Sequence, residues 1–244
     1  MRSVVLLSGG IDPVSGRPAP PAGEIAAIGL ALSVGGAVGG LHAGAPVPAL
    51  RQAAGHGLEQ VDCLQGGGDA VAVLAEALFA APPDLVLAGR QARGGEDSGM
   101  LPYLLAERLD WPLLSGVVAI GATAEGWLAV TIGLAQGARR PAQIRLPCIL
   151  CAHDAAPAPP FVFDRARRAV LRVVPVTGEE GPGMVAVEGT ERPYRARPRL
   201  IGTASGGGGT VLEHPDPAEA ARVLRDHLRA LGMLAPPREG AADA

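Results

Sequence analysis

Three glycine-rich loops are the features of this chain best suited to binding a ligand. They cover residues 8–10, 43–44 and 89–99, and each follows a short apolar run. Glycine has no side chain, so backbone N–H groups in such loops can approach a phosphate closely. If the apolar runs are parallel strands, the loops lie together at the carboxyl ends of a sheet, where open α/β sheets bind ligands. The loops therefore predict a nucleotide-type crevice, with simple turns as the alternative interpretation.

Cys148 and Cys151 form the next pattern that could do chemistry. Their CxxC spacing, with His153 nearby, suits a redox pair or half of a zinc site. The pair falls inside an apolar run typical of a buried strand, however, where cysteine usually serves as a small hydrophobic residue. His42, at the end of a predicted strand, is a candidate to face the ligand. No Ser-His-Asp order or pair of carboxylates indicates a catalytic residue, and we expect no metal site.

The composition excludes several classes of protein. The chain has 244 residues, enough for one large domain, and a net charge of −3, which argues against a general nucleic-acid-binding surface. Its 21 basic residues are all Arg, so no lysine is present to bind phosphate or to form a Schiff base. The N-terminal apolar run is too short for a signal peptide, and no apolar window of about 18 residues is free of Gly, Pro and charge. We therefore expect a cytoplasmic protein without membrane insertion.

Short buried strands alternate with helices over the first 110 residues. We predict strands at 3–8, around 41–43, at 61–65 and at 84–89, and helices at 24–32, 48–57, 69–81 and 99–109. This alternation predicts an α/β fold, a doubly wound and mostly parallel sheet with helices on both faces. Residues 113–150 have the pattern of β-hairpins, and Trp111 and Trp127 are expected in the core.

The rest of the chain is predicted to form an extended arm that ends in a helix. A Pro/Ala-rich linker at 152–163 and a short basic helix at 164–172 lead to a stretch with little periodicity that closes in SGGGGT, a glycine hinge. We therefore divide the chain into a nucleotide-binding domain at 1–172 and a C-terminal arm at 173–244.

The last helix of the arm has clear start and stop signals. Asp216 is a predicted N-cap, Pro217 the first helical residue and Gly232 the stop signal. An apolar stripe runs along one face of this helix, formed by Ala220, Leu224, Leu228 and Leu231. Such a helix either packs on its own domain or docks on a partner subunit.

Residues 84–112 resemble the nucleotide loop of the electron transfer flavoprotein β-subunit family. That family shows a strand, G-[KR]-Q-A, an acidic loop, a hydroxyl residue before Gly, a helix and L-x-W-P. The matching segments here are Gly89-Arg90-Gln91-Ala92, Glu96-Asp97-Ser98-Gly99 and Leu109-Asp110-Trp111-Pro112. Other segments resemble the family in the same order, namely VVLLSGGIDP, GEIAAIGLAL, LHAGAP, RLPCIL and the closing hinge with its helix. The resemblance covers most of the chain except about residues 175–205.

The resemblance implies a fold, cofactors and partners. Such β-subunits are doubly wound, adenine nucleotide alpha hydrolase-like domains, and they pair with an α-subunit that makes most of the contacts to FAD. The heterodimer passes electrons from a flavoprotein dehydrogenase to a downstream acceptor, so the resemblance implies an electron carrier subunit rather than an enzyme. In many members the β-subunit crevice holds AMP, and in bifurcating members a second FAD. We expect FAD mainly in the α-subunit, and we favour AMP over a second FAD as the ligand of this chain if its crevice holds a nucleotide.

The resemblance also gives candidate cofactor-binding residues, which are Ser8, Gly9, Pro13, Ala43, Gln91, Asp97, Ser98, Gly99 and Met100. Pro13 falls where the family approaches the flavin of the α-subunit. The third loop is shorter than in the family, lacks Asn and reduces the acidic run to residues 96–97. Whether this loop holds AMP, a second FAD or nothing is therefore left open.

Phe161 matches the family's recognition loop by position, and that loop inserts an apolar side chain into the dehydrogenase. An aromatic residue on a proline-flanked segment is a suitable anchor, because it buries a large area at little entropic cost. The alternative is that Phe161 or Phe163 folds into the core. A predicted helix face with three arginines follows, either simply solvated or steering an acidic partner, formed by Arg165, Arg168 and Arg172.

Residues 8–12 (SGGID) also nearly match the SGG-x-D-S loop of the PP-loop ATP pyrophosphatases. Pro13 stands in place of the final Ser, which removes a hydroxyl and an N–H donor. An AMP-forming enzyme of that type is thus a second interpretation, and a non-catalytic nucleotide-binding regulator is a third.

Overall fold

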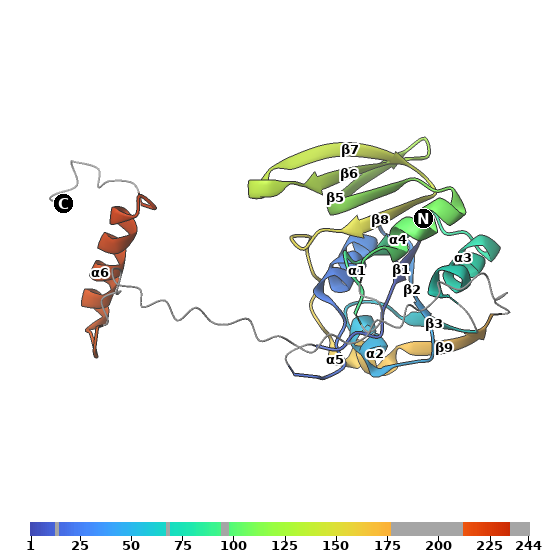
Figure 1. Cartoon of the computed structure of the whole chain (residues 1–244), viewed down its shortest axis with the longest axis horizontal. Coiled ribbons are helices and arrows are strands. Elements are labelled where there is room, and N and C mark those ends of the chain that lie inside the picture. The colour runs from blue at the N-terminus through green and yellow to red at the C-terminus, as the bar shows by residue number, and fades with distance from the viewer. Residues whose placement is uncertain (13–14, 67–68, 94–97, 177–211, 235–244) are drawn as a thin grey trace, which may run out of the picture. The chain divides into compact units, whose positions relative to one another are not determined.

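One nine-stranded sheet organises the first of two compact units, residues 1–188, in the computed structural model (Figure 1). The second unit covers residues 189–244. The structure describes residues 1–12, 15–66, 69–93, 98–176 and 212–234, and the statements below concern these residues.

The strand order within the described residues is β7-β6-β5-β8-β4-β1-β2-β3-β9. The strands are β1 (Arg2–Leu6), β2 (Ala37–Ala43), β3 (Gln60–Gln65), β4 (Leu85–Ala88), β5 (Leu113–Ala124), β6 (Trp127–Gly133), β7 (Arg139–Arg145), β8 (Cys148–Ala152) and β9 (Val170–Pro175). All neighbours from β5 to β9 in this order are parallel, whereas β6 and β7 add an antiparallel extension. The predicted α/β fold with a mostly parallel sheet is confirmed.

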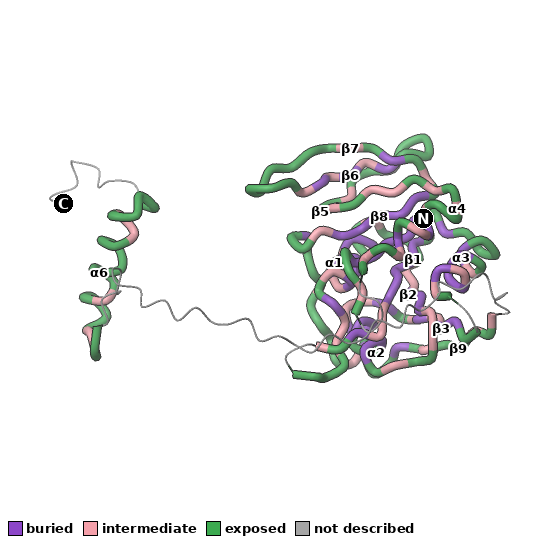
Figure 2. Tube along the Cα trace, in the orientation of Figure 1, coloured by how far each residue is buried: buried purple, intermediate pink, exposed green. Residues whose placement is uncertain are grey.

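Helices cover both faces of this sheet. They are α1 (Ala22–Val34), α2 (Pro48–Ala54), α3 (Ala70–Ala80), α4 (Leu101–Leu109) and α5 (Phe163–Arg168), with a short 3₁₀ turn at Ala135–Gly137. Helices α1 and α2 enclose one apolar core with Val5 and Leu87, and α3 and α4 enclose a second with Val4 and Val86. Neighbouring residues of β1 and β4 thus point to opposite faces, as the period of two in a strand requires. Figure 2 shows the central strands buried between these layers.

The order in which successive strands are added to the sheet changes direction at β1. Strands β1, β2 and β3 follow one another on one side, and β4 then returns to pair with β1 on the other side. Such a reversal separates the loops that follow β1 and β4, and it leaves a crevice at the carboxyl ends of these strands. The topology therefore places the predicted glycine loops after β1, β2 and β4 around one crevice.

Two expectations about the second half of this unit are wrong. Trp127 is not in the core, because it begins β6 on the antiparallel extension and is 48% exposed, whereas Trp111 is partly buried against the second core. The basic helix ends at Arg168 instead of continuing to residue 172, because Val170 joins the sheet as the first residue of β9 beside β3. Arg165, Arg168 and Arg172 therefore do not share one helix face.

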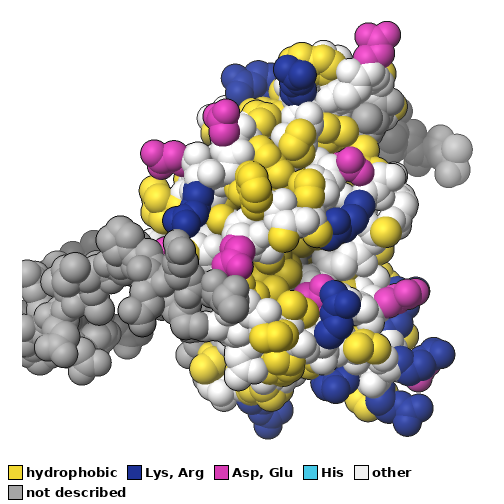
Figure 3. All heavy atoms as spheres, turned by 90° about the vertical axis from the view of Figure 1, so that its right-hand side faces the viewer, with side chains coloured by type: hydrophobic (Ala, Val, Ile, Leu, Met, Phe, Trp, Pro, Cys, Tyr) yellow, Lys and Arg dark blue, Asp and Glu magenta, His cyan; other side chains and the backbone are white. Residues whose placement is uncertain are grey.

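The outer surface over α3 and α4 is partly apolar. Phe79 of α3 is 82% exposed, and Tyr103 of α4 is also exposed. On the face of the molecule that bears α3, hydrophobic side chains are spread over the surface with charged side chains between them (Figure 3).

In the second unit the described part is α6 (Pro217–Ala230) with its flanks. Pro217 is its first residue and Gly232 has a positive φ of 71° just beyond it, both as predicted, although the Asp216 side chain makes no capping hydrogen bond. The glycine hinge lies outside the described residues. Leu224 and Leu231 of the apolar stripe are exposed. Across the described ranges, we find no helix of the length and apolarity needed to cross a membrane.

Candidate functional site

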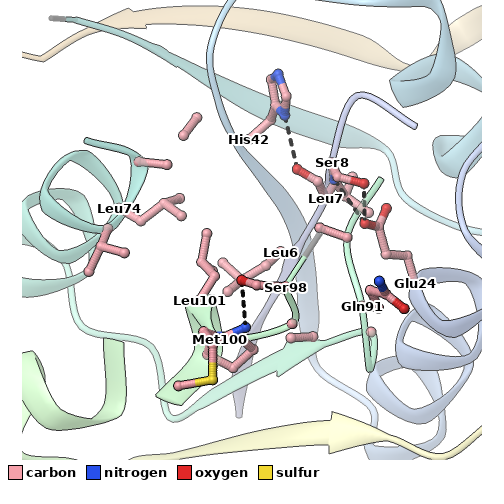
Figure 4. Close-up of a pocket in the computed structure, with 18 of the residues that line it drawn as sticks. Leu6, Leu7, Ser8, Glu24, His42, Leu74, Gln91, Ser98, Met100 and Leu101 are labelled. Carbon is pink, nitrogen blue, oxygen red and sulfur yellow. Dashed lines mark hydrogen bonds between the residues drawn. The ribbon is translucent and has the colours of Figure 1, made fainter. Parts of the chain in front are cut away.

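A pocket of about 340 Å³ lies at the carboxyl ends of β1, β2 and β4 (Figure 4). Seven of the nine predicted cofactor-binding residues line it, namely Ser8, Gly9, Ala43, Gln91, Ser98, Gly99 and Met100. The other two, Pro13 and Asp97, lie outside the described residues. The three glycine loops are therefore parts of one site, as their positions after successive strands predict.

The pocket has a polar side and an apolar side. Ser8, Glu24 and Gln91 lie together on the polar side, at the junction of β1, α1 and the loop after β4 (Figure 4). The apolar side is formed by α3 and α4 together with the ends of β1 and β2, and its lining includes Leu6, Leu41, Val71, Leu74, Leu101 and Leu104. Such a division suits a ligand with one flat apolar part and one polar part.

Close contact between two glycines brings the start of α1 against the end of β4. A Cβ atom on Gly89 would lie 2.9 Å from the backbone nitrogen of Glu24 and 3.0 Å from the carbonyl carbon of Gly23. Any side chain here would collide with backbone, so the approach requires glycine. This contact fixes Glu24, in the first turn of α1, beside the pocket.

Glu24 is held by Ser8 from the end of β1. The backbone N–H and the hydroxyl of Ser8 both donate hydrogen bonds to Oε1 of Glu24, at 3.0 and 2.5 Å. The Ser8 hydroxyl in turn accepts a hydrogen bond from the Arg93 N–H at 3.1 Å. These bonds connect β1, α1 and the loop after β4 within one network.

Burial raises the pKa of the Glu24 carboxyl from its ordinary value of 4.5 to about 7, although the two hydrogen bonds from Ser8 oppose the rise. Its side chain lies deep in the pocket wall, and the residue is only 3% exposed. Sequence analysis did not identify Glu24 as a site residue. The one signal available was a carboxylate at the start of an otherwise apolar helix, which is equally typical of a favourable helix start.

His42 lines the pocket from the end of β2, as its position in the sequence suggested. Its Nδ1 is 2.9 Å from the backbone carbonyl oxygen of Leu7, which can only accept, so Nδ1 donates the proton of this hydrogen bond. The imidazole is thereby fixed in orientation between β1 and β2.

The N-terminus of α4 offers fewer donors than the sequence suggests. The Met100 N–H already donates to the Ser98 hydroxyl at 3.3 Å, and Pro102 has no N–H. The Tyr103 N–H bonds to the backbone oxygen of Met100. An anion at this end would therefore depend on the N–H groups of residues 98, 99 and 101 and on the nearby Arg93 side chain.

Cys148 and Cys151 do not form a redox pair. Both lie on β8, three positions apart, and they belong to the cores on opposite faces of the sheet. Burial raises the pKa of both thiols to about 12, so neither is a reactive thiolate at neutral pH. Within the described ranges, no group of three or more His, Cys, Asp or Glu side chains could hold a metal ion.

We predict that the three thiols of the folded chain resist alkylation. Cys63, Cys148 and Cys151 are all buried and free. With iodoacetamide at pH 8, mass spectrometry should find little modification in the native protein and three modified cysteines after denaturation in guanidinium. Rapid labelling of Cys148 or Cys151 in the native state would show that β8 opens readily.

Phe161 lies against the end of α2 and is half exposed. Its ring meets that of His56 edge to face, with centroids 5.5 Å apart, and a Cβ on Gly55 would collide with it. Phe163 is 74% exposed, so it does not fold into the core. Of the neighbouring arginines, Arg168 pairs with Asp164, and Arg172 on β9 binds Asp62 through two hydrogen bonds of 2.9 and 2.6 Å.

These features define an α/β protein with a mostly parallel sheet and a ligand-sized pocket at the carboxyl ends of its strands. Residues 20–178 match the family model described as electron transfer flavoprotein domain. Over 254 aligned residues the chain is 35% identical to the electron transfer flavoprotein subunit beta of Chromohalobacter salexigens, and the alignment covers 92% of each protein. The chain belongs to the electron transfer flavoprotein family and is related to its β-subunits.

Proposed function

We propose that this chain is the β-subunit of a heterodimeric electron transfer flavoprotein. In this role it helps to pass electrons from a flavoprotein dehydrogenase to a downstream acceptor, through FAD held mainly by an α-subunit. The observation that supports the proposal most strongly is the 35% identity to a β-subunit along 92% of the chain. The protein supplies burial, orientation and partner choice to the flavin, and acts as an electron carrier rather than a catalyst.

The pocket suits a bound adenine nucleotide, with AMP as the expected ligand. Its apolar side, which includes Leu74 and Leu101, can pack against a purine ring, and its polar side offers Ser8, Glu24 and Gln91 to the rest of the ligand. The helices on both faces and the reversal at β1 agree with an adenine nucleotide alpha hydrolase-like fold. The free thiols of the described structure suit the reducing cytoplasm proposed from the sequence.

Two surfaces are proposed to meet partners, one on the C-terminal helix α6 and one on the unit that carries the sheet. The apolar stripe of α6 includes Leu224, which is exposed in the described part of the chain, and this suits docking on the α-subunit. Phe161 offers a half-exposed aromatic ring just before α5, which suits contact with a dehydrogenase.

Co-expression with a candidate α-subunit from the same genome tests the function. The two chains should purify together as a yellow complex with a flavin absorption spectrum, and denaturation should release AMP. A colourless chain that stays alone would contradict the proposal. Release of pyrophosphate from ATP would instead identify a PP-loop enzyme, and nucleotide binding by a flavin-free monomer would identify a regulator.

We predict that a charge on the apolar stripe of α6 weakens assembly of this chain with the α-subunit. Leu224→Asp should weaken binding to the α-subunit about tenfold or more, because buried anchors of this kind dominate interfaces. Arg222→Asp, about 200° around the helix from Leu224, is the matched control and should bind like the wild type. Surface plasmon resonance against the immobilised α-subunit measures both, and equal losses in the two variants would argue against docking through this stripe.

Phe161→Ala is expected to slow flavin reduction by the dehydrogenase about tenfold, because an aromatic anchor is lost from the contact. Stopped-flow absorbance of the heterodimer's flavin measures the rate. Phe79→Ala, which removes a ring that is 82% exposed on α3, serves as the control and should leave the rate unchanged. An unchanged rate in the Phe161 variant would exclude this residue from the recognition surface.

A further inference from the structure

One oxygen of Glu24 is a buried hydrogen-bond acceptor without a partner. Ser8 satisfies Oε1 twice, whereas Oε2 is inaccessible to solvent and makes no hydrogen bond to any described residue. Leaving such an atom unpaired is destabilising, and more so for a charged group. Buried polar atoms are nearly always paired in folded proteins, so an unpaired one in the wall of a ligand pocket points to a partner on the ligand.

The groups around Glu24 restrict what that partner can be. From the loop after β4, Arg90 pairs with Asp154 at the surface, and Arg93 reaches Ser8 through its backbone N–H. From β2, His42 is engaged with the oxygen of Leu7. None of these groups supplies a cation to Oε2 in the described structure.

Among the described residues, Asp69 at the start of α3 is the other carboxylate that lines the pocket, and it accepts a hydrogen bond from the Val71 N–H. A phosphate beside Glu24 would therefore place a second negative charge next to the buried carboxylate, with no cation among the groups named above to neutralise it. An uncharged N–H or O–H group of the ligand, in contrast, satisfies Oε2 directly.

We propose that Glu24 selects the ligand of this pocket, with Oε2 accepting a hydrogen bond from an uncharged N–H or O–H of the nucleoside half of a bound nucleotide. The phosphate then lies away from Glu24, toward Arg93 and the start of α4. This proposal rests on the proposed function, because it takes the ligand of the pocket to be a nucleotide.

Binding of the ligand through Oε2 is coupled to the release of a proton from the Glu24 carboxyl. Because burial holds the pKa of free Glu24 at about 7, part of the protein is protonated at this carboxyl near neutral pH. A donor from the ligand favours the charged carboxylate, so binding lowers that pKa and releases a proton. Affinity should therefore rise about tenfold from pH 6 to pH 8 and then level off.

Isothermal titration calorimetry on the full heterodimer, freed of nucleotide, tests this assignment with AMP at pH 6 and pH 8. Titrations with IMP, which lacks the exocyclic amine, and with 2′-deoxy-AMP, which lacks one hydroxyl, identify the donor. We expect one analogue to bind roughly 10–100 times more weakly than AMP at pH 8 and to lose the dependence on pH.

Glu24→Gln should bind AMP with a similar loss and without dependence on pH, because its amide would present a donor in place of Oε2. Asp154→Asn removes an exposed carboxylate outside the pocket, and should retain the wild-type affinity and pH dependence. Should Glu24→Gln fail to fold, titration of the wild type in two buffers of different ionisation enthalpy replaces it. At pH 7, above the second phosphate pKa of about 6, this measures the protons released by Glu24, expected to be about half a proton per AMP.

The outcomes separate this proposal from the proposed function. AMP that binds equally at both pH values, without proton release and without loss in either analogue, overturns the role of Glu24 alone. Proton uptake on binding overturns it as well, because it would place the phosphate beside the carboxylate. If AMP does not bind at either pH, the nucleotide site itself is wrong, and the role of Glu24 with it.

Discussion

Replacing Glu24 with Gln is expected to remove a pH dependence from the stability of the ligand-free chain. Between pH 5 and pH 8 the wild type should lose roughly 2–3 kcal/mol of unfolding free energy relative to the variant. The physical origin is the burial of Glu24, which is 3% exposed and has a pKa of about 7 in the folded chain. Gln keeps the shape of the side chain but cannot ionise.

The sign follows from which state binds the proton. The pKa of this carboxyl is raised on folding, from its ordinary 4.5 to about 7, so between these values the folded chain keeps a proton that the unfolded chain has lost. The associated stability is complete below pH 4.5 and is lost as the pH rises through about 7. Above that range the cost of the buried charge is constant.

Urea unfolding at pH 5, 6, 7 and 8, followed by circular dichroism, measures the effect. Asp154→Asn is the control, since it removes a carboxylate that is mostly exposed and should follow the wild-type curve. If the curves of the wild type and of Glu24→Gln stay parallel over the whole range, Glu24 is not buried as the structure has it.

The parallel sheet and the position of its pocket could be predicted because both depend on local signals. Strands β1 and β4 are short apolar runs that end at glycine, and in a parallel sheet such ends converge whatever the details of packing. Seven candidate residues on three loops thus reach one pocket, although Ser8 and Met100 are separated by 92 positions in the chain.

Glu24 could not be found in the same way, because its environment depends on contacts distant in sequence. Ser8 and Arg93 complete its network, and the contact between Gly23 and Gly89 encloses it. Seen alone, a glutamate in the first turn of a helix predicts an exposed side chain near the helix dipole.

Trp127 and β9 were mispredicted for a related reason. Trp127 is a large apolar residue of the kind expected in a core, but it lies on the antiparallel extension and is 48% exposed. Val170 follows a basic helical pattern, and only the free edge of β3 draws it into the sheet. The outcome for Trp127 is determined by its place on the antiparallel extension and that for Val170 by the edge of the sheet beside β3, in both cases rather than by residue type.

Gly89→Ala is expected to damage both the fold and the pocket. The added methyl group would lie 2.9 Å from the backbone nitrogen of Glu24 and 3.0 Å from the carbonyl carbon of Gly23, and backbone atoms cannot move aside as a flexible side chain can. The start of α1 must therefore shift away from β4. We expect a loss of roughly 1–3 kcal/mol in unfolding free energy, typical of overpacked sites.

The same shift should weaken AMP binding more than the loss of stability alone explains, because it separates Glu24 from Ser8 while the rest of the pocket stays in place. Gly39→Ala is the matched control: Gly39 lies in β2 of the same sheet, and its added methyl group would meet nothing within 4 Å. Urea unfolding and calorimetry with AMP at pH 8 should show losses in both properties for Gly89→Ala and near wild-type behaviour for Gly39→Ala. If Gly89→Ala were unstable yet bound AMP normally at a temperature where it is folded, the contact between α1 and β4 would serve the fold only. The position of Glu24 would then not depend on it.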